Sequence, residues 1–272
     1  MNPVLLALAA FATAGIGALG GLGGAILLVP ILVLTGMDPR FAAPLGLTSV
    51  AAGSLAAAPL QIRGRTVNSR LAISTEIVGS SAALVGALIS GVIGKSTLSV
   101  VLGVVALIAA FAGGRRKGLR NRPDPSLGPD DVGEVPGTLA GVYPLGDGFV
   151  PYRAKRIPLG LLGMGAAGLI SGISGVGGGF IKTPTATEVM HVPIKVAAAT
   201  STFAVGITSV VGLLVYESQG RVVASDAALV AAAAICGGFL GARLQSLLAP
   251  QTVRRGLSVV LVVIGVLLVV RR

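Results

Sequence analysis

Two cationic side chains stand inside otherwise apolar stretches of the sequence. Lys182 follows a Gly-Phe-Ile tripeptide, and Arg243 lies in the run GGFLGARLQSLL. A charge at membrane depth is costly, so it marks a ligand pathway or a buried ion pair. Lys182 can donate three hydrogen bonds to an anion; alternatively it extends to the membrane surface or pairs with Glu188. Arg243 either lines the same path or anchors the inner end of its helix, and the second interpretation is favoured.

Hydroxyl groups form a second set of candidates. Thr48 and Ser49 in the first half of the chain, and Thr200 and Ser201 in the second, lie two to three turns into the helices that follow glycine-rich breaks. Their hydroxyls can donate to the oxygens of an anion. Alternatively, each bonds the carbonyl one turn earlier in its own helix.

Three acidic residues, Glu76, Glu188 and Glu217, lie in or beside apolar stretches. Burial of a carboxylate favours its protonated form, so one of them could carry a coupling proton. Solvation at the membrane surface is the favoured interpretation of all three.

A glycine-rich segment occurs twice, at residues 20–48 and 174–202, with an offset of 154 residues. Prolines recur in register, because Pro30 corresponds to Pro184 and Pro39 to Pro193. A helix that begins inside a membrane presents free N–H groups and a positive dipole end, and glycine lets an anion approach them. Close helix packing through small residues is the alternative. The candidate anion-binding glycines are Gly21, Gly23, Gly24, Gly175, Gly177, Gly178 and Gly179.

The composition indicates a polytopic α-helical membrane protein. Of 272 residues, 53% are hydrophobic and 11% are charged, whereas soluble domains carry about 25% charged residues. The net charge of +11 comes largely from short basic clusters beside apolar runs. That is the positive-inside pattern of a cell-membrane protein, and it requires no nucleic-acid partner.

The scarcity of reactive residues argues against an enzyme. One cysteine, Cys236, excludes an internal disulfide, and a single histidine, His191, makes a His/Cys metal site or a Cys-His nucleophile improbable. No GxxxxGK[ST] motif is present for ATP. We therefore expect no catalytic residues, metal or cofactor.

We expect about 8–10 hydrophobic helical segments in an all-α fold of two repeated halves, each starting with a Gly-broken or re-entrant helix. Residues 1–113 form the first transmembrane repeat, 114–156 a polar cytoplasmic linker without a folded domain, and 157–272 the second repeat. The expected segments are Leu5–Leu19, Ala25–Thr35, Ala42–Pro59, Leu71–Ile93, Thr97–Ala112, Leu159–Ser174, Phe180–Met190, Val196–Tyr216, Ala224–Leu248 and Val253–Val270.

The relative orientation of the halves has two solutions. If each broken segment crosses the membrane, the halves are parallel; if each is a re-entrant hairpin, they are inverted. Both solutions place the same numbers of Lys and Arg on the two sides. Paired broken helices favour inversion, since inverted repeats with discontinuous helices commonly frame a site at the midplane.

The GxGG…P pattern, followed by Pro, Ala and Thr/Ser, resembles the TauE/SafE sulfite exporter family (TSUP). The resemblance rests on Gly23-Gly24 to Thr48-Ser49 and on Gly175 to Ser201, and it covers essentially the whole chain. It implies a secondary transporter that exports a small sulfur oxyanion such as sulfite, sulfoacetate or a related organosulfonate. In the first half Leu47 precedes Thr48 where the second half has Ala199-Thr200-Ser201, so the two hydroxyl pairs need not be equivalent.

The residues themselves indicate only a small, anionic solute that binds between the broken helices and moves by alternating access. A transporter of a cation or neutral solute is the first alternative, and a membrane scaffold or enzyme the second. Expected partners are the anion and the lipid bilayer. A coupling proton or sodium ion, and a homodimer, stay open.

Overall fold

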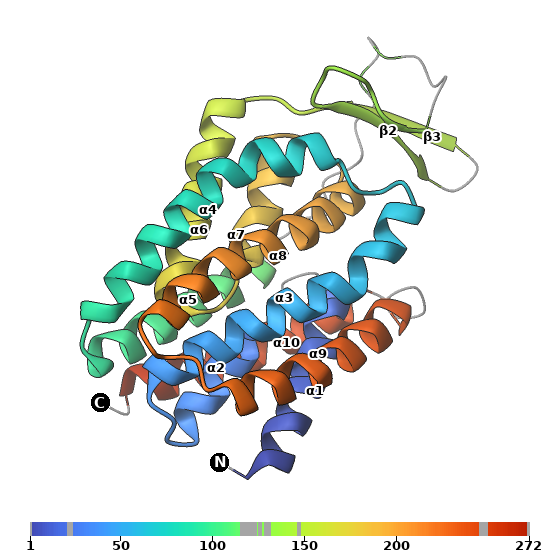
Figure 1. Cartoon of the computed structure of the whole chain (residues 1–272). Coiled ribbons are helices and arrows are strands. Elements are labelled where there is room, and N and C mark those ends of the chain that lie inside the picture. Colours follow the sequence, from blue (N-terminus) through green and yellow to red (C-terminus); the bar gives the residue numbers. More distant parts are fainter. Residues whose placement is uncertain are drawn as a thin grey trace.

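The computed structural model describes residues 2–20, 24–114, 124, 127, 132–145, 148–244 and 250–270. This part of the chain forms ten α-helices, one π-helix and a three-stranded sheet (Figure 1). The helices of the first half are α1 (Pro3–Gly20), α2 (Ala25–Leu34), α3 (Pro39–Arg63), α4 (Ser69–Val92) and α5 (Lys95–Gly114). Those of the second half are α6 (Ile157–Ser174), α7 (Gly179–Pro184), the π-helix η1 (Thr185–Val189), α8 (Ile194–Ser218), α9 (Ala224–Leu244) and α10 (Pro250–Val270).

The helices form where the sequence offers long uncharged apolar runs. Five of them, α3, α4, α6, α8 and α9, are long and apolar enough to cross a membrane. Polar residues begin some of them: the side chain of Asp38 accepts a hydrogen bond from Arg40 N at the start of α3. The predicted helical, multi-pass membrane protein is confirmed. Each expected segment corresponds to a helix, although residues 245–248 of the ninth lie outside the described residues.

Helix bounds recur at the offset of the sequence repeat. Moved by 154 residues, α1 gives the bounds of α6, and α2 falls on α7 followed by η1. In the same way α3, α4 and α5 fall on α8, α9 and α10 to within two residues. The two halves therefore follow the same order of helices. Their descent from one repeated unit stays a prediction.

Counterpart helices run in opposite directions. Arg221, just beyond the end of α8, donates a hydrogen bond to the carbonyl oxygen of Arg40 at the start of α3. Figure 1 shows α3 and α9 running toward the sheet, and α4 and α8 running away from it. Lys155 N donates to Met190 O, so α6 begins where η1 ends. This is the arrangement that an inverted pair of halves with re-entrant broken helices requires.

Glycines allow two cross-half helix pairs to pack closely. Helix α4 lies along α6, and α1 lies along α9. A Cβ atom at Gly168 would lie 1.9 Å from the carbonyl oxygen of Gly79, and one at Gly237 would lie 2.1 Å from that of Phe11. Small residues at such contacts let helix backbones approach each other within a membrane.

The expectation that the linker has no folded structure is wrong for residues 133–153. Strands β1 (Gly133–Glu134), β2 (Ala140–Leu145) and β3 (Gly148–Arg153) form an antiparallel sheet in the order β1-β2-β3. Tyr143 and Tyr152 are buried against residues of α4, α6, η1 and α8, which repays the cost of ordering the segment. Glu134 accepts hydrogen bonds from Ser69 N (2.5 Å) and Ser69 Oγ (2.6 Å) at the start of α4.

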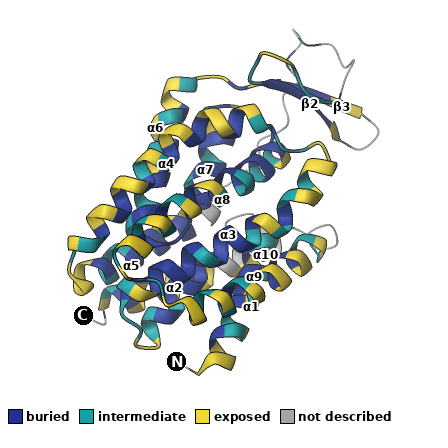
Figure 2. Cartoon of the chain, in the orientation of Figure 1, coloured by how far each residue is buried: buried dark blue, intermediate teal, exposed yellow. Residues whose placement is uncertain are grey.

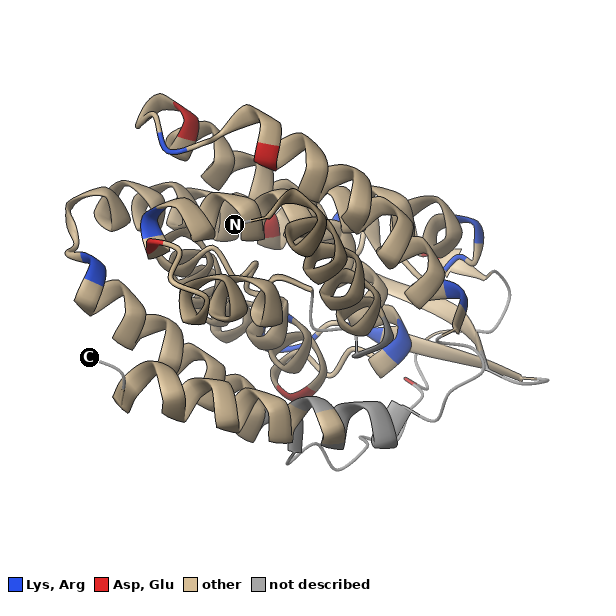
Figure 3. Cartoon of the chain, turned by 90° about the horizontal axis from the view of Figure 1, so that it is seen from below, with Lys and Arg blue, Asp and Glu red and all other residues tan. Residues whose placement is uncertain are grey.

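The sheet distinguishes the two ends of the helical bundle. We call the end with the sheet and residues 63–70 the sheet end, and the end with residues 38–40 and 218–221 the opposite end. Charged residues lie mostly toward these ends (Figure 3). The outward faces of the helices are exposed and rich in large apolar side chains, while the facing sides are buried (Figure 2). Such apolar outer surfaces are suited to contact with lipid.

Candidate functional site

A pocket lies between helices of both halves. Its volume is about 60 Å³ of space open to the centres of water molecules, which exceeds the roughly 10–15 Å³ that one water needs. Along α3 it extends from Ser49, in the middle of the helix, to Gln61 near the sheet end. The pocket is lined by Ala14, Gly17, Ala18, Gly24, Ser49, Val50, Gly53, Ser54, Ala57, Gln61, Gly179, Thr183, Ser201, Thr202, Val205, Gly238 and Ala242.

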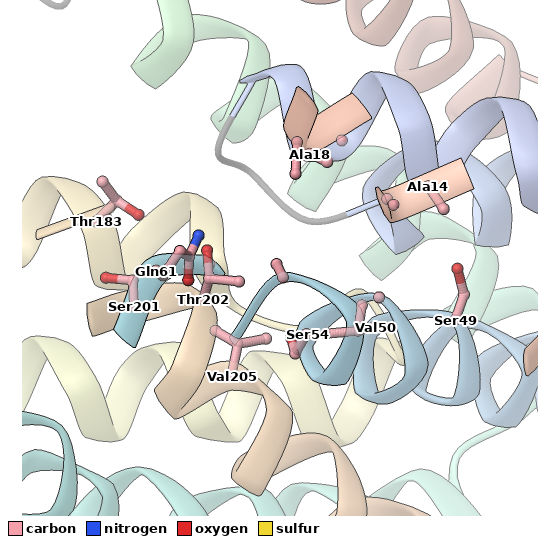
Figure 4. A pocket seen from close by; sticks show the side chains of 17 residues that line it. Ala14, Ala18, Ser49, Val50, Ser54, Gln61, Thr183, Ser201, Thr202 and Val205 are labelled. Carbon is pink, nitrogen blue, oxygen red and sulfur yellow. The ribbon is translucent and has the colours of Figure 1, made fainter. Parts of the chain in front are cut away.

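The polar lining of the pocket consists of neutral groups. Figure 4 shows that α3, α7 and α8 contribute the labelled hydroxyl and amide side chains. Within the described part of the chain, Ser49 Oγ, Gln61 Oε1 and Thr183 Oγ1 are buried and lack a hydrogen-bond partner. Buried polar atoms without partners are costly, so these three atoms indicate a place where a ligand or water completes the hydrogen bonding.

The second-half glycine break forms one wall of the pocket. Gly175, Gly177 and Gly178 have φ values of 73°, 87° and 66°, a region that glycine occupies without strain. A Cβ atom at Gly175 would lie 2.3 Å from the carbonyl oxygen of Ala43. Gly179 begins α7 and lines the pocket. These glycines therefore serve close packing and the turn into α7, and only Gly179 of this group reaches the pocket lining.

The first-half break is described only at its end. Gly21 and Gly23 lie outside the described residues. Gly24 has an ordinary helical conformation at the start of α2, and it lines the pocket. A Cβ atom there would lie 2.6 Å from Ala14 Cα, so Gly24 combines a place at the pocket with close packing of α2 on α1.

The four candidate hydroxyls separate into two groups. Ser49 and Ser201 line the pocket. Thr48 Oγ1 instead donates to the carbonyl oxygen of Pro44 (2.9 Å), one turn earlier in α3. Thr200 Oγ1 accepts a hydrogen bond from Asn68 N (3.0 Å). The structure thus brings one serine from each half to the pocket and gives both threonines other partners.

Lys182 is not among the residues that line the pocket, and it forms a buried ion pair. Its Nζ lies 2.7 Å from Glu76 Oε2, and the two side chains are 1% and 4% exposed. Thr208 Oγ1 accepts from Lys182 and donates to Glu76, and Ser80 Oγ donates to Glu76 Oε1 (2.9 Å). Two sequence-based interpretations are therefore wrong. The partner of Lys182 is Glu76 of α4, and Glu76 is enclosed in protein instead of solvated at the surface.

Arg243 lies outside the pocket lining. It is exposed in the last turn of α9, with its guanidinium 4.4 Å from the centre of the Phe239 ring. This position fits the end-of-helix interpretation. Its neighbour Ala242 does line the pocket.

Sequence reasoning missed Thr183 and Thr208. Thr183 follows Lys182 directly, and a polar pair at the start of a broken helix was a usable signal for the pocket. Thr208 gave no such signal, because its role depends on α8 packing against α4. The pairing of Lys182 with Glu76 was foreseeable in outline, since isolated opposite charges within a membrane tend to pair.

A multi-pass helical protein with a small pocket between its two halves, apolar for the most part and carrying a few polar groups, has the architecture of a membrane transporter. The chain belongs to the family described as "Sulfite exporter TauE/SafE", whose model matches residues 6–268. It is 25% identical over 279 residues to the probable membrane transporter protein YunE of Bacillus subtilis (strain 168), covering 97% of this chain and 96% of that protein. These names describe membrane transporters rather than enzymes.

A second relative is the probable membrane transporter protein MamO of Magnetospirillum gryphiswaldense (strain DSM 6361 / JCM 21280 / NBRC 15271 / MSR-1). It is 29% identical over 199 residues, which cover 66% of this chain and 30% of that protein. No solved structure matches the chain.

Proposed function

We propose that this protein is a secondary transporter that binds one small sulfur oxyanion, such as sulfite, sulfoacetate or a related organosulfonate, in the pocket between its halves. The observation that carries the proposal is the set of unpartnered atoms Ser49 Oγ, Gln61 Oε1 and Thr183 Oγ1 at the pocket. The hydroxyls of Ser49 and Thr183 can each donate a hydrogen bond to an oxyanion oxygen, and Gln61 can donate through its amide nitrogen, whereas its Oε1 only accepts. The family description adds the substrate class and export as the direction.

Access to the pocket is proposed to alternate between the two ends. Gln61 places the pocket toward the sheet end. At the opposite end, Arg221 donates to Arg40 O (3.0 Å) and to Ser90 Oγ (2.7 Å), and so links α3, α4 and the end of α8. We propose that this network closes the opposite end in the present state and that it separates when the solute leaves on that side.

The absence of a cationic side chain from the described pocket lining supports a second candidate, a neutral solute. Hydroxyls and an amide can serve a neutral polar molecule as well as an anion, because each offers both donors and acceptors. The two candidates, an anion and a neutral solute, differ in whether binding requires a charge on the ligand. A series of ligands with different charges measures this.

The test is a thermal-shift series on detergent-purified protein with sulfite, sulfoacetate, isethionate, taurine, sulfate and chloride. A ligand that binds only the folded state raises the melting temperature as its concentration rises. Stabilisation by sulfite or a sulfonate, and none by chloride, is the expected result. Taurine at neutral pH is a zwitterion, so stabilisation by taurine alone would favour the neutral solute.

Variants locate the ligand. Thr183→Val keeps the side-chain shape but removes the hydroxyl, and a hydrogen bond to a charged group is worth roughly 1.5–3 kcal/mol, or about 10- to 100-fold in affinity. Thr48→Val is the matched control, since its hydroxyl bonds within its own helix. Equal affinity in both variants, or no stabilisation by any anion, would overturn this assignment.

A further inference from the structure

The ion pair between Lys182 and Glu76 has an internal comparison in the same chain. At the offset of 154 residues Lys182 corresponds to Leu28, and Glu76 corresponds to Val230. Leu28 and Val230 are fully buried and belong to one apolar core cluster. The equivalent place in the fold, between α2 of the first half and α9 of the second, is therefore filled with two apolar side chains.

This comparison tests whether the ion pair is needed for the helices to pack. A buried ion pair loses its hydration, and apolar residues of similar size often stabilise the same site as well or better. Since the helices pack without charges at the equivalent place, the helix arrangement does not require them. The charges of Lys182 and Glu76 thus need another reason, and an ionisable group within a membrane protein is a functional site by default.

The elements packed around the pair supply no other charge near it. Helices α6 and α8 pack against α4, and α5, α6, α8 and η1 pack against α7. Helix α6 contains no ionisable residue. The ionisable residues on the other elements are Arg70 early in α4, Lys95 at the start of α5, Lys195, Tyr216 and Glu217 near the ends of α8, and the exposed Glu188 of η1.

Lys182 is adjacent along α7 to residues that line the pocket. Lys182 precedes Thr183 and follows Gly179 within one turn of α7, and both of those residues line the pocket. With Glu76 ionised, the net charge of the pair is zero and its carboxylate repels an anion in the pocket. With a proton on Glu76, Lys182 keeps its charge, and the pair presents one positive charge to the anion.

We propose that Glu76 is the proton-binding site that couples proton binding to anion binding in this transporter. The proposal rests on the proposed function and adds the coupling ion. The proton adds to a carboxylate oxygen of Glu76, Lys182 compensates the anion, and one proton travels with each monovalent anion without net charge movement. By linkage, the proton raises the affinity for the anion by the same factor as the anion raises the affinity for the proton.

The first experiment measures anion affinity as a function of pH. For each anion of the series that stabilises the purified protein, we expect tighter binding at pH 6 than at pH 8, by about 5- to 150-fold. Isethionate is the most direct probe, because its sulfonate keeps one charge over this range. Glu76→Gln mimics the protonated state, so it should bind at pH 8 as tightly as the unmodified protein at pH 6. Glu188→Gln, which removes an exposed carboxylate from η1, should leave the pH dependence unchanged.

The second experiment does not depend on the stability of a single variant. The double variant Lys182→Leu/Glu76→Val installs the residue types of the equivalent place, Leu28 and Val230, and we expect it to fold. In proteoliposomes with an internal pH dye, the unmodified protein should carry about one proton per isethionate or other monovalent anion that binds. The double variant should retain the pocket hydroxyls but bind anions independently of pH and move no protons.

The outcomes separate the two proposals. Anion binding that is equally tight at pH 6 and 8 in the unmodified protein, or pH dependence that persists in Glu76→Gln or in the double variant, overturns proton coupling and leaves the pocket assignment intact. If no anion stabilises any variant at either pH, the proposed function itself fails.

Discussion

The two broken segments occupy equivalent places but have different chemistry. Helix α2 has ten residues, all of them apolar, and continues without interruption past Pro30. Its counterpart is the six-residue helix α7, which changes into the π-helix η1 after Pro184. A π-helical turn loosens the regular hydrogen-bond ladder and is frequent at functional sites. One segment thus resembles a packing element, and the other carries the polar groups.

The two halves share the same order of helices, but the side chains of this segment differ between them. In the first half, α2 is almost entirely buried in the main apolar cluster. In the second, Lys182 and Thr183 are buried polar residues, one in an ion pair and one at the pocket. In the first half this segment consists of apolar core residues, and in the second half it carries the buried polar side chains. Three substitutions examine this division.

The largest effect is expected for Lys182→Leu. The change leaves Glu76 buried without its cation, and removal of one partner of a buried pair costs about 3–5 kcal/mol. The melting temperature in detergent should fall strongly, and adding Glu76→Val should restore most of it. Lys195→Leu, at an exposed cation in the first turn of α8, is the control with little expected change. A small effect of Lys182→Leu alone would mean that the pair is weaker than its burial indicates.

A smaller loss is expected for Gly175→Ala, which examines the second-half break. The new Cβ meets the backbone of Ala43, overpacking costs roughly 1–3 kcal/mol, and the left-handed conformation adds about 1–2 kcal/mol. Gly220→Ala has a similar φ of 66° but open space around the glycine, so only the second cost applies. Melting curves of both variants separate the two costs, and equal losses would rule out the close contact.

The sequence predicted the helices well because their signals are local. Long apolar runs, glycine breaks and the repeat with Pro30 and Pro184 gave ten segments that the structure contains. The sheet was missed because Pro, Asp and Gly dominate the average composition of residues 114–156. Its strands depend on the burial of Tyr143 and Tyr152 against the helices, a tertiary effect that composition does not reveal.

The site was predicted less completely, because pairing between distant segments decides it. Ser49 and Ser201 were recognised from their place after the breaks, and both line the pocket. The partner of Lys182 is 106 positions away, so its identity depends on α4 lying beside α7 and α8. Thr48 and Thr200 have the right residue type, but helix rotation and the contact with Asn68 direct their hydroxyls elsewhere.

The smallest of the three effects concerns Asn68, whose counterpart at the offset of 154 is Val222. Asn68 Oδ1 accepts from Leu71 N (2.8 Å) and so caps α4, while its Nδ2 donates to the Tyr152 hydroxyl (3.1 Å). Burial raises the pKa of Tyr152 to about 12, against the lowering effect of this hydrogen bond. The phenol therefore stays protonated at neutral pH, and its oxygen remains an acceptor for Asn68.

Asn68→Val introduces the residue of the other half and removes all the side-chain hydrogen bonds of Asn68, which include a third one from Nδ2 to Ala140 O (3.5 Å). Loss of a helix cap costs about 1 kcal/mol, and an unpaired buried hydroxyl adds a loss of roughly 1 kcal/mol. The melting temperature of Asn68→Val should fall moderately. That of Asn68→Asp, which keeps the capping oxygen, should fall less. If valine is tolerated at position 68 as it is at 222, then the sheet end does not depend on this cap, and the linker sheet is held by its apolar contacts and by the hydrogen bonds between Ser69 and Glu134.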